Sequence, residues 1–112
     1  MNLDLVLRDL AVPGGVTPTA MTRDPDFVFL YGVDGSSTGI DPDLPLAELA
    51  SRVQDWAVED LWTRRLPTNW PPCPVHPSTH PLRAAEDGDR AVWRCPAQGG
   101  VIAAVGSLPI PA

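Results

Sequence analysis

The chain has 112 residues, of which 44% are hydrophobic and 20% charged, a composition that suits one small domain with a modest core. The formal net charge is −6, and the basic residues are all arginines scattered along the chain. An acidic surface without a basic stripe repels phosphate, which argues against a nucleic-acid partner. No apolar run approaches the roughly 20 residues of a membrane-spanning helix, which argues against a membrane partner.

The N-terminal stretch MNLDLVLRDL lacks the basic and long apolar regions of a signal peptide, so we expect a cytoplasmic protein. In a reducing compartment, the two cysteines are expected to be free or metal-bound rather than joined in a disulfide. Basic residues that are all arginine, in a chain rich in alanine, proline, glycine and valine, are typical of a GC-rich genome and indicate a bacterial or phage protein.

Residues 2–12 fit two patterns. Leucine at positions 3, 5 and 7 alternates as in a strand, whereas the apolar positions 3, 6, 7 and 10 share one helical face. We favour a helix, with Asn2 as its cap and Pro13-Gly14-Gly15 at its end. Residues 13–25 are rich in proline and glycine and predict a loop.

The segment DFVFLYGV contains the clearest strand, because Phe27 to Tyr31 form a compact run of β-forming residues bounded by Pro25 and Gly32. The following DGSSTG has turn chemistry and predicts a hairpin turn rather than a phosphate loop. A short return strand is expected at Thr38–Ile40.

Residues 44–65 carry the strongest helical pattern, with Asp43 as the expected cap and Pro45 in the first turn. Arg64 and Arg65 would complement the dipole of the last turn. Trp56 and Trp62 are interpreted as core and edge packing rather than as ligand-stacking residues. The apolar stripe comprises Leu46, Leu49, Ala50, Val53, Ala57 and Leu61.

From Thr68 onward, proline-rich turns alternate with short β-like runs. Strands are expected at Leu82–Ala85, at Arg90–Cys95 and at Val101–Leu108. The first two are joined by EDGD, whose central Asp-Gly is typical of a hairpin turn.

Two similar pieces flank this hairpin: CPVH, beginning at Cys73, and CPAQ, beginning at Cys95. Residues 70–108 therefore resemble a zinc ribbon, in which two such turns present four ligands to one zinc ion. The resemblance implies that Cys73 and His76 form the first ligand pair and that Cys95 is the third ligand. In such turns backbone amides point at the thiolates, and the metal stabilises a hairpin too small to bury a core.

The fourth ligand position deviates from the zinc-ribbon pattern. Gln98 stands where a ribbon has Cys or His, and glutamine is a poor zinc ligand. His80 offers a replacement and gives the set Cys73, His76, His80 and Cys95, spaced C-x2-H-x3-H-x14-C. Three ligands plus water would instead make an open, catalytic zinc site, although no carboxylate is well placed as its base. A third possibility is a hairpin without metal, in which the cysteines are small buried apolar residues.

These observations predict an α+β fold: a single domain over 1–112, with one long amphipathic helix packed on short antiparallel strands in an N-terminal part, 1–67, and a zinc-ribbon-like β-unit in 68–112. We expect a non-enzymatic protein-interaction module or small accessory or inhibitor protein, and the sequence leaves open whether its Cys/His turns hold a structural zinc ion or no metal. We expect its partner to be another protein, a basic one where it meets the aspartate-rich loops (Asp24, Asp26, Asp34, Asp41, Asp43). The exposed side of the long helix (Arg52, Asp55, Glu59, Asp60) is the second candidate contact surface. The alternative is a metal-dependent enzyme with an open site at Cys73, His76 and Cys95.

Overall fold

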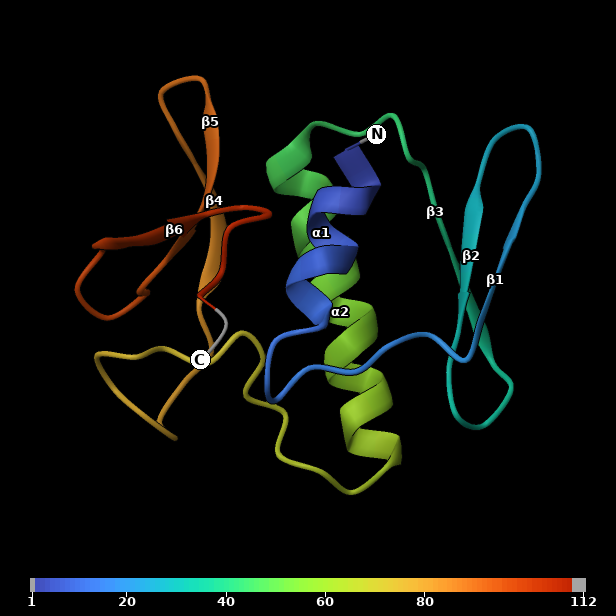
Figure 1. Cartoon of the computed structure of the whole chain (residues 1–112), viewed down its shortest axis with the longest axis horizontal. Coiled ribbons are helices and arrows are strands. Elements are labelled where there is room, and N and C mark those ends of the chain that lie inside the picture. The colour runs from blue at the N-terminus through green and yellow to red at the C-terminus, as the bar shows by residue number, and fades with distance from the viewer. Residues whose placement is uncertain (1, 110–112) are drawn as a thin grey trace.

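The computed structural model describes residues 2–109 (Figure 1). Within them lie two helices and two three-stranded antiparallel sheets, so the fold is α+β as predicted, with a second helix beside the long one. The helices lie between the two sheets. The elements in chain order are α1 Asn2–Leu10, β1 Ala20–Arg23, β2 Val28–Tyr31, β3 Ser37–Ile40, α2 Leu46–Thr63, β4 Arg83–Asp87, β5 Arg90–Arg94 and β6 Val101–Ala104.

The N-terminal segment forms a helix rather than a strand. In α1, Leu3, Val6 and Leu10 are buried and share one face, and the helix packs on α2. This burial decides between the two patterns, because only the helical period brings all three side chains to the core.

The first sheet has the order β1–β2–β3, and its first strand corrects the expectation of a loop over residues 13–25. Ala20–Arg23 pairs antiparallel with β2, with Met21 opposite Leu30. All four residues of β1 are exposed, so the strand carries no apolar alternation that the sequence could have revealed. The sheet meets the core through Val28, Leu30 and Ile40.

The long helix differs from its prediction at both ends. It begins at Leu46 with Pro45 in the cap position and no side-chain cap; the expected cap, Asp43, instead donates its backbone N–H to Asp41 in the preceding turn. Near the other end, Trp62 is 76% exposed, so its interpretation as a packing residue was wrong. Asp60, predicted on the exposed side, is buried.

Asp60 is buried because it ties α2 to the first sheet. Its Oδ1 accepts the backbone N–H of Val33 at 2.9 Å, and its Oδ2 accepts Nε of Arg64 at 2.9 Å. Gly32 passes so close that a Cβ there would lie 2.7 Å from Asp60 Oδ1. The carboxylate therefore fixes the β2–β3 turn against the helix.

The second sheet has the order β4–β5–β6. Its hairpin turn contains Gly88 at a φ of +65°, the backbone conformation for which the Asp-Gly turn was predicted. The register shifts between Trp93 and Arg94. The last strand ends at Ala104, four residues earlier than expected, because the chain turns at Gly106 (φ +92°) toward α1.

Asp9 of α1 accepts hydrogen bonds from the segment that follows β6. It is fully buried, and its carboxylate accepts the backbone N–H groups of Gly106 at 2.6 Å and Leu108 at 3.1 Å. The indole N–H of Trp93 donates to the same carboxylate at 2.8 Å, and that of Trp70 donates to the Asp9 carbonyl at 3.2 Å. One buried acidic residue thus joins the first helix to the second sheet. No helix among residues 2–109 combines the length and apolarity needed to cross a membrane.

Candidate metal centre

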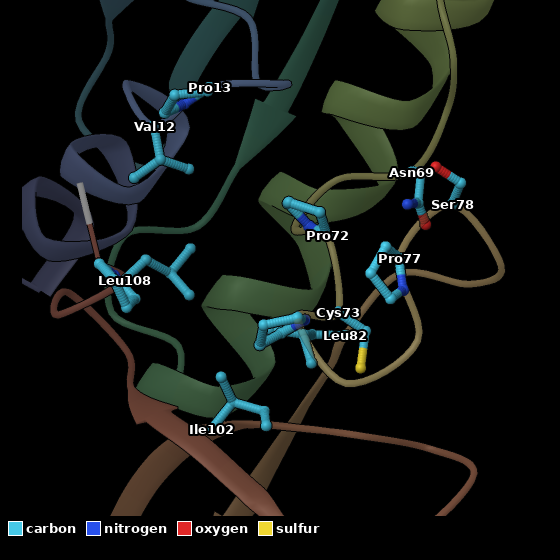
Figure 2. Close-up of a pocket in the computed structure, with 12 residues that line it drawn as sticks. Val12, Pro13, Asn69, Pro72, Cys73, Pro77, Ser78, Leu82, Ile102 and Leu108 are labelled. Carbon is cyan, nitrogen blue, oxygen red and sulfur yellow. The ribbon is translucent and has the colours of Figure 1, made fainter. Parts of the chain in front are cut away.

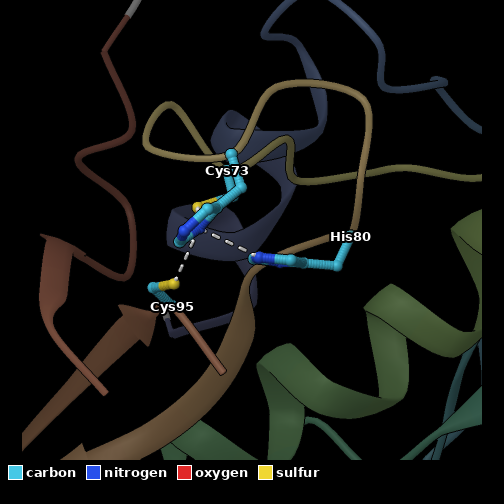
Figure 3. A group of neighbouring side chains, drawn as sticks. Cys73, His80 and Cys95 are labelled. Carbon is cyan, nitrogen blue, oxygen red and sulfur yellow. Dashed lines mark hydrogen bonds between the residues drawn. The ribbon is translucent and has the colours of Figure 1, made fainter. Parts of the chain in front are cut away.

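Cys73, His76, His80 and Cys95 come together between the loop that precedes β4 and the turn that follows β5 (Figure 3). Their ligand atoms, one from each residue, all lie within 4.8 Å of one another. The structure therefore brings the four sequence-predicted residues into one cluster that could hold a metal ion such as zinc. The loop supplies three of them and the turn one, whereas a ribbon would take two from each side.

The loop is closed at its neck by main-chain and side-chain hydrogen bonds. The backbone N–H of Leu82 donates to the carbonyl of Pro71 at 2.7 Å. From α2, the amide Nε2 of Gln54 donates to the carbonyls of Leu82 at 2.7 Å and Trp70 at 3.2 Å. These bonds fix the residues on either side of Cys73 and the histidines, so the cluster is positioned by the long helix.

The two histidines are oriented by the turn between them. The backbone N–H and the hydroxyl of Thr79 both donate to the carbonyl of His76, at 3.2 and 2.6 Å. Nδ1 of His80 lies 3.1 Å from the carbonyl of Pro81. Since a carbonyl oxygen only accepts, Nδ1 carries the proton and Nε2 presents its lone pair to the cluster. A backbone carbonyl that fixes the tautomer in this way is the usual second partner of a metal-binding histidine.

Cys95 sits in the turn between β5 and β6. Its backbone N–H donates to the carbonyl of Gly100 at 2.9 Å, and its carbonyl accepts the N–H of Gly99 at 2.7 Å. Burial raises the pKa of the Cys95 thiol, but hydrogen bonds from the N–H groups of Gln98 and Ala97, and from the Cys73 thiol, outweigh it, so the pKa is lowered. The turn thus favours the thiolate, which is the form that binds metals. Gln98 contributes its backbone N–H to this arrangement.

The distances around His76 allow a test against zinc. Nδ1 of His76 lies 3.8 Å from Sγ of Cys73, 3.5 Å from Sγ of Cys95 and 3.2 Å from Nε2 of His80. A zinc ion with usual bond lengths and tetrahedral angles separates a sulfur from a nitrogen ligand by about 3.6 Å, and two nitrogen ligands by about 3.3 Å. The three separations at His76 agree with these edges, and all four ligand atoms lie within 4.8 Å of one another, so the cluster could hold a metal ion such as zinc.

Both sulfurs are buried, with the cysteines about 1% exposed, whereas the histidines are partly exposed. Within residues 2–109, the cluster includes no aspartate or glutamate. Glu86 lies within β4 opposite Ala91, and Asp89 lies in the β4–β5 turn. The donor set of two thiols and two imidazoles is one of the common structural zinc sets.

No protein-family model, no curated protein and no solved structure matches this chain.

Sequence reasoning missed the residues that support the cluster. Gln54 lies beside the apolar stripe of α2, and no spacing rule connects it to a loop 16 residues away. Asp9 gave a clearer signal, because it lies three residues after Val6 on the buried side of α1. An acidic residue on an apolar helical face indicates a buried polar contact.

Proposed function

We propose that the chain is a non-enzymatic protein-interaction module whose C-terminal β-unit is stabilised by a structural zinc ion held by Cys73, His76, His80 and Cys95. The agreement of the distances around His76 with the edges of a zinc tetrahedron carries the metal assignment. The chain departs from a zinc ribbon in taking three ligands from one loop.

Four protein ligands favour a structural role over catalysis. A catalytic zinc keeps a coordination position for water or substrate, whereas structural sites are closed by four side chains. Here His80 fills the corner that an open site would leave to water. The ion would contribute folding free energy by joining the loop before β4 to the turn after β5.

Elemental mass spectrometry of the full chain, purified without added metal, tests the zinc assignment. We expect about one zinc ion per chain, and its loss in Cys95→Ser, because a hydroxyl does not replace a thiolate ligand. Metal-free wild-type protein that is folded and thermally stable would overturn the assignment.

His80→Ala and Gln98→Ala form a matched pair for the fourth corner. We expect His80→Ala to lower zinc affinity by at least about tenfold, because the ion loses one of four ligands. Gln98→Ala keeps the backbone N–H that points to Cys95 and leaves zinc affinity unchanged. Equal loss in both variants would contradict the assignment of His80.

The interaction role is supported by a hollow of about 240 Å³ between α2 and the β2–β3 turn, where aromatic and acidic side chains meet. Trp62, which is largely exposed, lines this hollow together with Asp34 and Glu59. The N–H and hydroxyl of Ser36 donate to Asp34 and lower the pKa of its carboxyl. An ionised carboxylate beside an exposed indole suits a lysine or arginine side chain of a basic partner.

Affinity capture from the native host, quantified by mass spectrometry, tests this role. We expect a partner present in stoichiometric amount that is lost with Trp62→Ala and weakened by salt. Val101→Ala changes an exposed apolar residue of β6 and serves as the control. Capture that is identical in wild type and Trp62→Ala would contradict the proposed contact surface.

A further inference from the structure

Two cavities adjoin the metal-binding loop, and they differ in charge. The first, of about 340 Å³, is lined mostly by prolines and aliphatic side chains such as Ile102 and Leu108 (Figure 2), and none of the described residues that line it is charged. The second, which we call the α2–β4 groove, has a volume of about 870 Å³ and lies between α2 and residues 80–84. A volume near the upper end of the range for ligand sites suits a segment of chain.

One wall of the α2–β4 groove is formed by the metal-binding segments. His80 and Pro81 line it, and so does Pro96, which directly follows the candidate ligand Cys95. The ring of His80 points to the cluster (Figure 3), and its Nδ1–H donates to the carbonyl of Pro81 at 3.1 Å. A metal ion held by Nε2 of His80 and by Cys95 would therefore fix this wall from both of its segments.

The opposite wall, on α2, carries two carboxylates without partners. Asp55 and Glu59 are exposed, line the groove and lie one helical turn apart. Among residues 2–109, neither carboxylate takes part in an ion pair or a side-chain hydrogen bond. Val58 on the same wall and Ala84 on the facing one are apolar and partly buried. Such a lining suits lysine or arginine, whose aliphatic stem packs on apolar surface while its charge meets a carboxylate.

Two further features of the lining favour an extended basic segment. Arg83 on the facing wall is exposed and, within the described part of the chain, has no ion pair. Its guanidinium can donate to main-chain carbonyl groups of a bound segment, and the two carboxylates still outnumber it. Glu59 also lines the hollow that contains Trp62. The groove and the hollow therefore meet at one residue, and a single segment can follow α2 from one to the other.

We propose that the α2–β4 groove binds an extended basic segment of the partner protein, and that the metal ion strengthens this binding by holding the wall that contains His80 and Pro96. The proposal rests on the interaction role and the zinc site proposed above, and adds a second contact and its regulation. Because linkage is reciprocal, the segment raises the affinity for zinc by the same factor by which zinc raises the affinity for the segment.

An NMR titration of the full-length, zinc-loaded chain at low salt tests the groove with two peptides. Acetylated tetra-arginine amide carries guanidinium groups, and its tetra-citrulline counterpart has nearly the same shape with neutral urea groups. We expect saturable amide shifts at Ser51, Asp55 and Ala84 with the arginine peptide. The citrulline peptide should bind at least about tenfold more weakly, because it cannot form ion pairs with the carboxylates. Shifts confined to the aspartate-rich loops would overturn the proposal.

Asp55→Asn/Glu59→Gln and Glu86→Gln/Asp89→Asn form a matched pair of double variants. Both remove two exposed carboxylates, and only the first removes carboxylates that line the groove. We expect the first variant to lose most of its preference for the arginine peptide, and the second to bind as the wild type does. Equal loss in both variants would mean that net charge, rather than the groove, attracts the peptide, and would overturn the proposal.

Competition with a fluorescent chelator measures the link to the metal. We expect the chain to bind zinc about tenfold more tightly with saturating arginine peptide, and with unchanged affinity in the presence of the citrulline peptide at the same concentration. Unchanged zinc affinity with the arginine peptide bound would overturn the coupling. Zinc content and partner capture are measured without peptide, so this failure is distinct from failure of the proposed function.

Discussion

The two sheets have the same topology and different means of attachment. Each is a three-stranded antiparallel meander beside α2. The first contributes aliphatic residues of β2 and β3 to the core and leaves β1 exposed. The second is held by the buried carboxylate of Asp9, by two tryptophans and by the Cys/His cluster. Both sheets thus combine apolar burial with a buried carboxylate, and the second adds the tryptophan pair and the Cys/His cluster.

The difference follows from the supply of apolar side chains. In β2, Val28 and Leu30 alternate with half-buried residues and face the helix, as a one-sided sheet requires. In β4 no residue is fully buried, and the buried side chains of the second sheet are Val92 and Trp93 of β5. Trp93 packs edge-to-face on Trp70, with ring centroids 5.5 Å apart, a favourable aromatic geometry. We therefore expect the second sheet to gain stability from the Asp9 hydrogen bonds and from the Cys/His cluster at its ends.

Removal of the metal is expected to have the largest effect on stability. It should destabilise the second sheet more than the first. Chelation of zinc should lower the unfolding free energy by at least about 5 kcal/mol, because structural zinc sites in small domains contribute about 10 kcal/mol or more. For a chain of this size that loss lowers Tm by about 20 °C or more. Calorimetry with and without chelator measures it.

Amide hydrogen exchange locates the effect. On chelation we expect faster exchange in β5 and β6, while Val28 and Leu30 of β2 keep their protection because their contacts lie on the other side of α2. Equal acceleration in both sheets would contradict the separate attachment described here.

Substitution of Asp9 should have the next largest effect. Asp9→Ala leaves the N–H groups of Trp93, Gly106 and Leu108 without an acceptor in a buried place. We expect a loss of about 3 to 5 kcal/mol, since each unsatisfied buried donor costs about 1 to 3 kcal/mol. Denaturant unfolding followed by far-UV circular dichroism measures the loss.

Asp55→Ala is the matched control, because it removes the same charge from an exposed position of α2. Its effect should stay within about 0.5 kcal/mol. A similar loss in the two variants would mean that net charge, rather than the hydrogen bonds of Asp9, governs stability.

Much of this fold could be predicted because its elements carry periodic apolar residues or turn chemistry. The strand at Val28–Tyr31, the long helix and the Asp-Gly hairpin all follow from such local signals. The strand at Ala20–Arg23 could not be predicted, because it has no buried face and forms by pairing with β2. The exposure of Trp62 could not be predicted either, since the apolar pattern of the helix does not indicate how far along it the neighbouring sheet extends.

The candidate site was predictable in residue type and not in geometry. Proline-stiffened Cys and His turns indicated the set, but the spacing left the fourth corner open between His80 and Gln98. The Thr79 hydrogen bonds to His76 and the Pro81 carbonyl beside His80 orient the two histidines, which lie in one cluster with the cysteines. Both depend on the closed neck of the loop, which is built from α2. That the cluster binds zinc remains a prediction.

The smallest effect is expected at Asp60, the tether of the first sheet. Asp60→Ala leaves the Val33 N–H without its acceptor and Arg64 without its ion pair. We expect a loss of about 1 to 3 kcal/mol, below that of Asp9→Ala, because apolar packing still holds β2 and β3. Hydrogen exchange should accelerate at the β2–β3 turn and remain unchanged in β5. A loss equal to that of Asp9→Ala would show that both sheets depend on buried carboxylates to the same degree.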